Sequence, residues 1–242
     1  MTSLDPVVDK VTILGIAGSP RAGNTEIMVR EALAGAMEVG QVETEFFSFH
    51  RRQFGPCIGE CYEYCAEHGD CCFMDDFQEF LDLWLRADGI IFGVPVYHVS
   101  VPAQVKAAID RLGNVLCSHL GEEVPRFSKV CAAITQGLDR FGGQELTMQY
   151  LMQHFLVMNC IAIAGDLLDS YIGAAGIAGG IELDAILQDE QGLRTARNVG
   201  RRVAEMTRIV KAGLAVLSEE LPEGYFFKRD RLGKKRTEAE EG

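Results

Sequence analysis

Long apolar runs and a secretory leader are both missing from this 242-residue sequence. The best candidate for a membrane span, residues 161–186, is interrupted by Asp166, Asp169, Glu182 and several glycines, whereas a spanning helix needs about 20 mostly apolar residues. The first ten residues carry Pro6 and two aspartates where a secretory signal has a basic stretch and an apolar run. We therefore expect a cytoplasmic protein with no membrane partner.

Basic residues are also scarce. Lys and Arg total 23 against 35 Asp and Glu, which gives a formal net charge of -12 and a pI of about 4.9. Such an acidic surface repels a phosphate backbone, so nucleic acid is not an expected partner. A nucleotide cofactor is still compatible with this charge, because backbone amides bind phosphate whatever the net charge.

Cysteine, by contrast, is plentiful. There are eight cysteines, and five of them lie within sixteen positions: Cys57, Cys61, Cys65, Cys71 and Cys72. The cytosol keeps thiols reduced, so the clustering favours metal ligation or redox chemistry over structural disulfides. Cys131 and Cys160 lie in apolar runs, and we expect both to be small buried core residues.

Apolar runs alternate with helical patterns along the chain. Four runs have the composition of strands buried on both faces of a sheet, and residues 42–49 alternate as a half-exposed edge strand does; the four runs are 11–16, 89–94, 130–135 and 160–164. This alternation predicts an α/β doubly wound parallel sheet with strand order 2-1-3-4-5.

The predicted domain spans residues 10–217, with an extension before it and a tail after it. A cysteine-rich loop, residues 55–74, is inserted after strand 2, and the small-residue stretch 169–180 is expected to be an irregular loop. Residues 1–9 form an N-terminal extension. Residues 218–242 form a charged C-terminal tail that is expected to be disordered or to act as an interaction arm.

Ligands of such a sheet bind where the strand order reverses, beyond the carboxyl ends of strands 1 and 3. After strand 1 comes the phosphate loop, residues 18–25, whose hydroxyls, amide, arginine and free helix N–H groups predict a phosphate cradle formed by Ser19, Arg21, Asn24 and Thr25. It is neither a Walker A loop nor G-x-G-x-x-G. A capped turn with Asn24 or Thr25 at the N-cap is a compatible interpretation.

Two other segments are expected at the same edge of the sheet. An aromatic residue with neighbouring amides, or a glycine that allows close approach, can flank a flat ring, which makes candidates of Pro95, Val96, Tyr97, His98, Gln136 and Gly137. Each candidate has an alternative interpretation. Tyr97 could be a core aromatic, and His98 could be a surface residue rather than a proton donor. Gln136-Gly137 could be a plain loop. Asp110 and Arg111 are expected to form a helix-end ion pair rather than a site.

At these residues the sequence resembles the NADPH-dependent FMN reductase superfamily of flavodoxin-like proteins, and within it the iron–sulfur flavoprotein group. The resemblance covers roughly residues 10–210, and its carriers are Gly18-Ser19-Pro20-Arg21, Gly23-Asn24-Thr25, Pro95-Val96-Tyr97 and Ile109-Asp110-Arg111. It implies one FMN per subunit, with the phosphate on Ser19, Arg21, Gly23, Asn24 and Thr25 and the isoalloxazine near residues 95–98 and 136–137. It also implies homodimers or homotetramers with the flavin near a subunit interface.

The group's cysteine pattern is matched approximately. The group has a compact C-x2-C-x2-C-x4/5-C run before an Asp pair, and here the spacing is wider, with Cys57, Cys61, Cys65 and Cys71 before Asp75-Asp76. Cys71 keeps the group's distance to the Asp pair, so it is the implied fourth ligand and Cys72 the spare. Four thiolates can bind a [4Fe-4S] cluster; zinc and free redox-active thiols are the alternatives.

The favoured hypothesis is an FMN-dependent oxidoreductase that passes electrons between a donor, an iron–sulfur cluster, FMN and an acceptor. A flavin can take up two electrons and release them singly, and a cluster exchanges one electron at a time. Because the cofactors carry this chemistry, no catalytic residue is predicted. NADPH, NADH and ferredoxin are the candidate donors. An NAD(P)H-dependent FMN or quinone reductase with a structural cysteine loop is the first alternative, and a non-enzymatic FMN-binding redox or metal sensor is the second.

Overall fold

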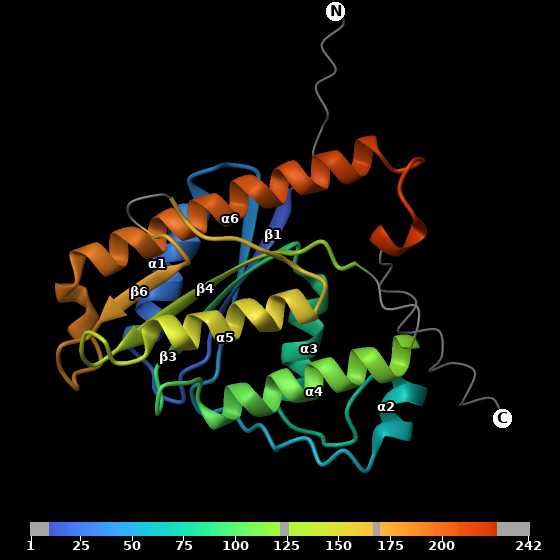
Figure 1. The fold of residues 1–242 in the computed structure, drawn as a ribbon, viewed down its shortest axis with the longest axis horizontal. Coiled ribbons are helices and arrows are strands. Elements are labelled where there is room, and N and C mark those ends of the chain that lie inside the picture. The colour runs from blue at the N-terminus through green and yellow to red at the C-terminus, as the bar shows by residue number, and fades with distance from the viewer. Residues whose placement is uncertain (1–9, 122–125, 167–169, 227–242) are drawn as a thin grey trace, which may run out of the picture.

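The computed structural model describes residues 10–121, 126–166 and 170–226. Its centre is a six-stranded parallel sheet in the order β2-β1-β3-β4-β5, with β6 also beside β4 (Figure 1). The predicted order is therefore confirmed. The strands are β1 (Val11–Ala17), β2 (Val42–Ser48), β3 (Gly89–Pro95), β4 (Val130–Gly137), β5 (Ile161–Ala162) and β6 (Ala174–Ile177).

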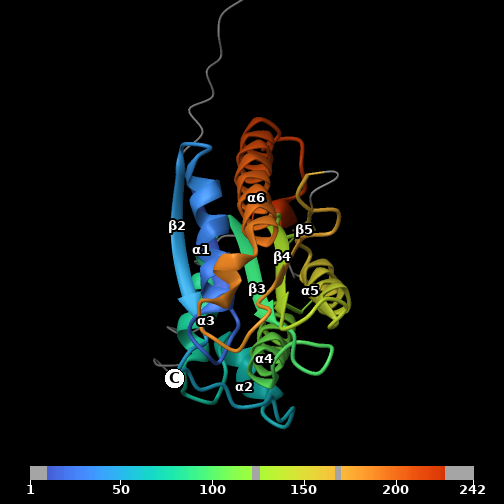
Figure 2. The same cartoon turned by 90° about the vertical axis from the view of Figure 1, so that its left-hand side faces the viewer.

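Helices cover both faces of the sheet (Figures 1 and 2). α1 (Asn24–Met37) and α6 (Glu190–Val216) bury apolar residues on one face, and α3 (Phe77–Arg86), α4 (Ala103–Leu120) and α5 (Gln144–Val157) do so on the other. The short helices α2 (Tyr62–His68), η2 (Ala185–Gln188) and η3 (Glu223–Tyr225) lie in connections. Within the described ranges, no helix combines the length and apolar character that crossing a membrane requires.

α1 and α6 pack closely because glycines lie at two of their contact positions. A Cβ on Gly200 would lie 1.7 Å from the Ala32 carbonyl oxygen, and one on Gly35 would lie 2.2 Å from that of Arg197. Arg197 also donates a 2.6 Å hydrogen bond to Glu31. This packing fixes α1, and so it fixes the phosphate loop that precedes α1.

The edge beyond β4 differs from the prediction. The strand expected at 160–164 is reduced to the two residues of β5, and the stretch expected to be an irregular loop contains β6. β6 pairs with residues 134–137 at the end of β4. Its small residues are there because of close packing, since a Cβ on Gly176 would lie 2.5 Å from the Met28 sulfur. The extension 1–9 and residues 227–242 of the tail lie outside the described residues.

Candidate functional site

The three predicted ligand segments meet at the carboxyl ends of β1, β3 and β4. One cavity of about 60 Å³ is lined by residues from all three: Ser19, Arg21, Ala22, Asn24, Thr25, Pro95, Tyr97, Gln136 and Leu183. Val96 joins this edge through its backbone N–H, which donates to the Gln136 carbonyl at 2.8 Å. The fold thus brings the predicted residues together at the point where the strand order reverses.

The phosphate loop turns sharply from β1 into α1. Gly23 at the N-cap has φ 119°, and a Cβ there would lie 2.2 Å from the Leu183 carbonyl oxygen, so only glycine fits. Ser19 and Thr25 are buried, and Gln136 Nε2 donates to Thr25 Oγ1 at 3.4 Å. The first amides of a helix have no carbonyl partner within it, which suits a phosphate.

The side chains of Arg21 and Asn24 point to the connection between β6 and η2. Arg21 Nη2 donates to the Ile181 carbonyl at 2.9 Å, and Asn24 Nδ2 donates to that of Glu182 at 2.9 Å. Asn24 Oδ1 accepts from the Ile186 amide at 3.0 Å. These side chains therefore position residues 181–186 over the loop, a connection that the sequence interpretation missed.

His50, at the end of β2, is another residue that the sequence interpretation missed. Its Nδ1 accepts a 3.1 Å hydrogen bond from the backbone amide of Ala22 in the phosphate loop. The imidazole thereby ties the loop to the edge strand. No motif marks this histidine, because the contact forms only once strand 2 lies beside strand 1.

Tyr97 stands at the start of a tight turn after β3. Its backbone exchanges hydrogen bonds of 2.8 and 3.0 Å with Ser100, and between them His98 and Val99 have φ 50° and 65°. A β-branched residue in this left-handed region is strained, and such strain gathers at ligand sites. The Tyr97 side chain is 42% exposed, which rules out the core-aromatic interpretation. His98 is exposed beside it.

Exposed apolar side chains lie on the three loops that follow β3, β4 and β6, and one of them lines the cavity. Val99 follows β3, Leu138 and Phe141 follow β4, and Ile181 and Leu183 follow β6. The cavity holds little more than water, so a flat ring would lie over it against these side chains rather than inside it. Helix amides, buried hydroxyls and an open aromatic rim fit the chemistry of a flavin mononucleotide.

The cysteine segment, residues 55–75, lies between β2 and α3. It contains α2, with Cys61 at the N-cap and Cys65 in the first turn. Burial, together with the neighbouring thiols of Cys57, Cys61 and Cys71, raises the pKa of Cys65 to about 11. A hydrogen bond with Cys61, together with burial, raises the pKa of Cys72 to about 12. Cys65 therefore lies near the thiols of Cys57, Cys61 and Cys71, and Cys72 lies near that of Cys61.

These thiols do not form a ready-made metal site. No three or more Cys, His, Asp or Glu side chains among the described residues have the arrangement of a metal site. The predicted ligand set, Cys57, Cys61, Cys65 and Cys71, stays a prediction. The donor chemistry of the segment nevertheless fits a thiolate-bound group, since four of the thiols fall within fifteen residues and polar N–H groups reach their sulfurs.

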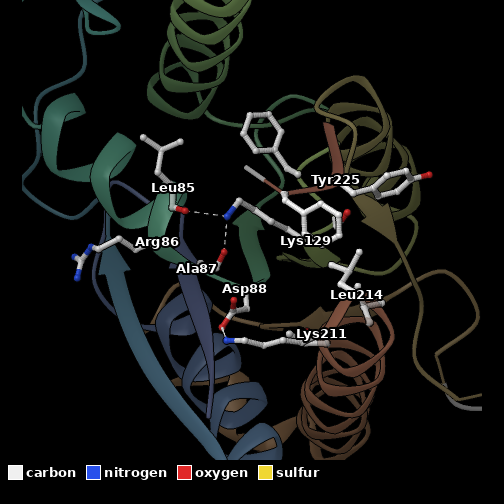
Figure 3. Close-up of a pocket in the computed structure, with 13 residues that line it drawn as sticks. Leu85, Arg86, Ala87, Asp88, Lys129, Lys211, Leu214 and Tyr225 are labelled. Carbon is white, nitrogen blue, oxygen red and sulfur yellow. Dashed lines mark hydrogen bonds and ion pairs between the residues drawn. The ribbon is translucent and has the colours of Figure 1, made fainter. Parts of the chain in front are cut away.

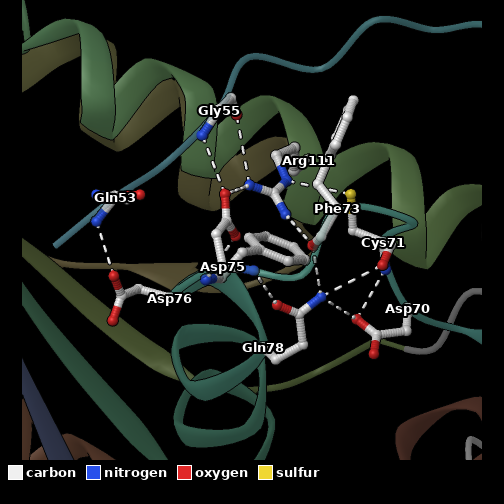
Figure 4. Close-up of polar contacts among 10 residues, drawn as sticks. Gln53, Gly55, Asp70, Cys71, Phe73, Asp75, Asp76, Gln78 and Arg111 are labelled. Carbon is white, nitrogen blue, oxygen red and sulfur yellow. Dashed lines mark hydrogen bonds and ion pairs between the residues drawn. The ribbon is translucent and has the colours of Figure 1, made fainter.

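Arg111, on α4, places a buried cation against this segment. The residue is 1% exposed, and its guanidinium donates to Asp75 at 2.6 Å, to the Phe73 carbonyl at 3.1 Å and to the Cys71 sulfur at 3.2 Å (Figure 4). Burial by itself would raise the pKa of Asp75, but the Arg111 hydrogen bond and two backbone amides outweigh it and hold the pKa below its ordinary value.

The expected Asp110–Arg111 ion pair is wrong. Adjacent helical residues point about 100° apart, so Asp110 pairs instead with Lys106, one turn earlier, while Arg111 turns inward. The distant partner, Asp75, also accepts a 3.1 Å hydrogen bond from the amide of Gly55. The two ends of the cysteine segment are therefore joined to each other and to α4.

A second cavity, of about 530 Å³, lies at the amino ends of β3 and β4 (Figure 3). Its buried Lys129 donates to the carbonyls of Leu85 and Ala87, at the end of α3. Burial lowers the pKa of Lys129 to about 8. The lysine caps the helix terminus, and none of the predicted site residues lines this cavity.

Comparison with known proteins agrees with this geometry. Residues 11–170 match the family model of NADPH-dependent FMN reductase. An iron–sulfur flavoprotein of Methanocaldococcus jannaschii is 40% identical over 200 residues, which cover 82% of this chain and 98% of that protein. One of Archaeoglobus fulgidus is 36% identical over 194 residues, 80% of this chain and 96% of that protein.

Similarity to a solved structure supports the flavodoxin-like fold. A flavodoxin, WrbA-like protein from Agrobacterium tumefaciens superposes with a TM-score of 0.52 at 19% identity, covering 83% of this chain and 99% of that one. Sheet order, site geometry and sequence relatives agree. The chain belongs to the NADPH-dependent FMN reductase family and is a flavin-dependent oxidoreductase with a flavodoxin-like fold.

Proposed function

We propose that the protein is an electron-transfer flavoprotein that holds FMN at the phosphate loop and a [4Fe-4S] cluster at Cys57, Cys61, Cys65 and Cys71. The observation that carries this proposal is that α4 contacts the first and last of these thiols, Asn114 at the Cys57 sulfur and the buried, positively charged Arg111 at the Cys71 sulfur. The two archaeal relatives, both iron–sulfur flavoproteins, support it.

The side chains would bind and orient rather than react. The helix amides and the buried hydroxyls of Ser19 and Thr25 would hold the FMN phosphate, and Tyr97 would flank the ring. Bound FMN supplies one- and two-electron chemistry, and a cluster exchanges electrons singly. Arg111 and Asp75 would keep the cysteine segment closed around its ligand thiols.

The electron partners follow from this proposal. NADPH or NADH would stack on the exposed flavin face over the cavity rim, and ferredoxin is the alternative donor. We propose a homodimer or homotetramer in the cytoplasm, where thiol ligands stay reduced. Light scattering coupled to size-exclusion chromatography measures the oligomeric state.

Anaerobic purification followed by iron, sulfide and FMN analysis tests the proposal. We expect about four iron atoms and four sulfides per subunit together with one FMN. Zinc with FMN, or FMN with no metal, would contradict the cluster.

A plain NAD(P)H-dependent FMN or quinone reductase is the second candidate, favoured by the family-model match. Anaerobic addition of NADPH distinguishes it, because a reductase without a cluster bleaches the flavin bands and leaves no broad iron–sulfur absorption. Flavin that does not respond to NADPH, in a protein without a cluster, would instead favour the FMN-binding sensor.

A further inference from the structure

One face of α4 directs N–H groups at two cysteine sulfurs. Asn114 Nδ2 lies 3.3 Å from Cys57 Sγ, and Arg111 Nε lies 3.2 Å from Cys71 Sγ. Residues three apart on an α-helix share a face, so the two donors stand side by side. They reach the first and the last of the four proposed ligands, which come from opposite ends of the cysteine segment.

The Arg111 donor is rigidly held. Its remaining N–H groups bond Asp75, the Phe73 carbonyl and the Gly55 carbonyl, and the guanidinium carbon lies 4.3 Å from the centre of the Phe77 ring. This arrangement leaves the Nε–H aimed at sulfur with no freedom to turn away (Figure 4). Burial also keeps water from screening the charge.

The Asn114 donor differs in its surroundings. Asn114 is an exposed residue, and its amide is neutral. Its contact with the Cys57 sulfur is therefore a simple N–H···S hydrogen bond at the solvent side of the segment. Because Asn114 is exposed, we expect that it can be changed without disturbing the core.

We propose that Arg111 and Asn114 are positioning residues that raise the reduction potential of the cluster through N–H···S contacts to Cys71 and Cys57. The inference rests on the proposed function. A cluster gains negative charge when it is reduced, and N–H dipoles or a guanidinium at the ligand sulfurs stabilise that added charge. Removing either donor should therefore make reduction harder.

The experiment compares two variants of the full chain, purified anaerobically. Asn114→Ala removes one amide donor, and Arg111→Lys keeps the positive charge but loses the directed Nε–H. Gln104→Ala, which removes an amide from the same helix, and Lys106→Met, which removes an exposed cation from it, are the matched controls. Iron, sulfide and FMN are counted, and spectroelectrochemical titration gives separate midpoint potentials for the cluster and for FMN.

We expect the cluster potential to shift to more negative values in both variants, with the FMN potential unchanged and both controls like the wild type. A cluster potential equal to that of the wild type in both variants, at full iron content, overturns the inference and leaves the proposed function standing. Wild-type protein without iron and sulfide overturns both. If Arg111→Lys loses iron, Asn114→Ala decides: a negative shift supports the inference, and an unchanged potential overturns it.

Discussion

The side-chain oxygen of Asn24 accepts a 3.0 Å hydrogen bond from the backbone amide of Ile186, across 162 positions of sequence. The same side chain donates to Glu182. Asn24 thus holds the connection after β6 against the phosphate loop, where Leu183 lines the cavity. Its effect on cofactor binding is expected to act through this connection, whereas Ser19 is expected to contact the phosphate directly.

FMN affinity should depend on both residues. We predict that Ser19→Ala together with Asn24→Ala weakens FMN binding roughly 10- to 150-fold, because a charge-assisted hydrogen bond to phosphate contributes about 1.5–3 kcal/mol. Titration of the apo-protein with FMN measures the loss. Ser118→Ala, which removes a half-buried hydroxyl from α4, is the control. Unchanged affinity in the double variant would place the phosphate elsewhere.

Tyr97 should shape the flavin's surroundings without holding the cofactor alone. An aromatic contact adds about 0.5–1.5 kcal/mol beyond burial, so Tyr97→Ala should lower FMN affinity roughly 2- to 12-fold and shift the flavin spectrum or potential. Tyr97→Phe keeps the ring and should retain most of the affinity. Identical affinity, spectrum and potential in Tyr97→Ala would show that the side chain lies away from the ring.

The central strands could be predicted because burial on both faces leaves a mark in the sequence. β1, β3 and β4 are continuous apolar runs, and their order follows from the handedness of parallel connections. β6 could not be predicted, because its small residues have the composition of a loop. They form a strand only where Met28 and β4 leave no room for larger side chains.

Some features of the site could likewise be predicted from the sequence, and others could not. Ser19, Tyr97 and Gln136 could be predicted to lie together, since each is at or just beyond the carboxyl end of a buried strand near the point where the strand order reverses. The ion pair expected between Arg111 and Asp110 is wrong because local spacing carries no information about a partner that is distant in sequence. The true partner of Arg111, Asp75, lies 36 positions earlier and becomes close only when the cysteine segment folds back on α4.

Acid stability should depend on His154. This residue of α5 is buried beside a cavity of about 410 Å³ shared with α4, and burial lowers its pKa from 6.5 to about 4, against an opposing effect of Asp110. As the pH falls from 6.5 towards 4, the unfolded chain binds a proton that the folded chain does not. Stability present above pH 6.5 is therefore lost in this window, by about 2 kcal/mol between pH 8 and pH 5.

Urea unfolding at pH 8 and pH 5 measures this effect. His154→Gln cannot take up the proton, so its free energy of unfolding should fall by about 2 kcal/mol less than that of the wild type over the same interval. His98→Gln changes an exposed imidazole and is the control. An equal loss in His154→Gln and the wild type would show that this histidine does not carry the acid sensitivity.

The choice of cysteine ligands is the sharpest prediction. Replacing any of Cys57, Cys61, Cys65 or Cys71 by Ser should lose iron, because a thiolate-bound cluster tolerates a missing ligand poorly. Cys72→Ser should keep iron and spectrum. Cys71 is buried with its sulfur held by Arg111, while Cys72 is half-buried and contacts Cys61, which makes it the competing ligand.

Iron, sulfide and FMN per subunit, measured after anaerobic purification, decide between these two neighbours. Adjacent residues in an extended segment point in opposite directions, so Cys71 and Cys72 rarely both reach one small cluster. Cys117→Ser changes an exposed thiol on α4 and should match the wild type. FMN should survive in every variant, since the phosphate loop is separate in sequence. Loss of iron in Cys72→Ser with retention in Cys71→Ser would exchange the two assignments, because the thiol whose removal empties the site is the one that binds it.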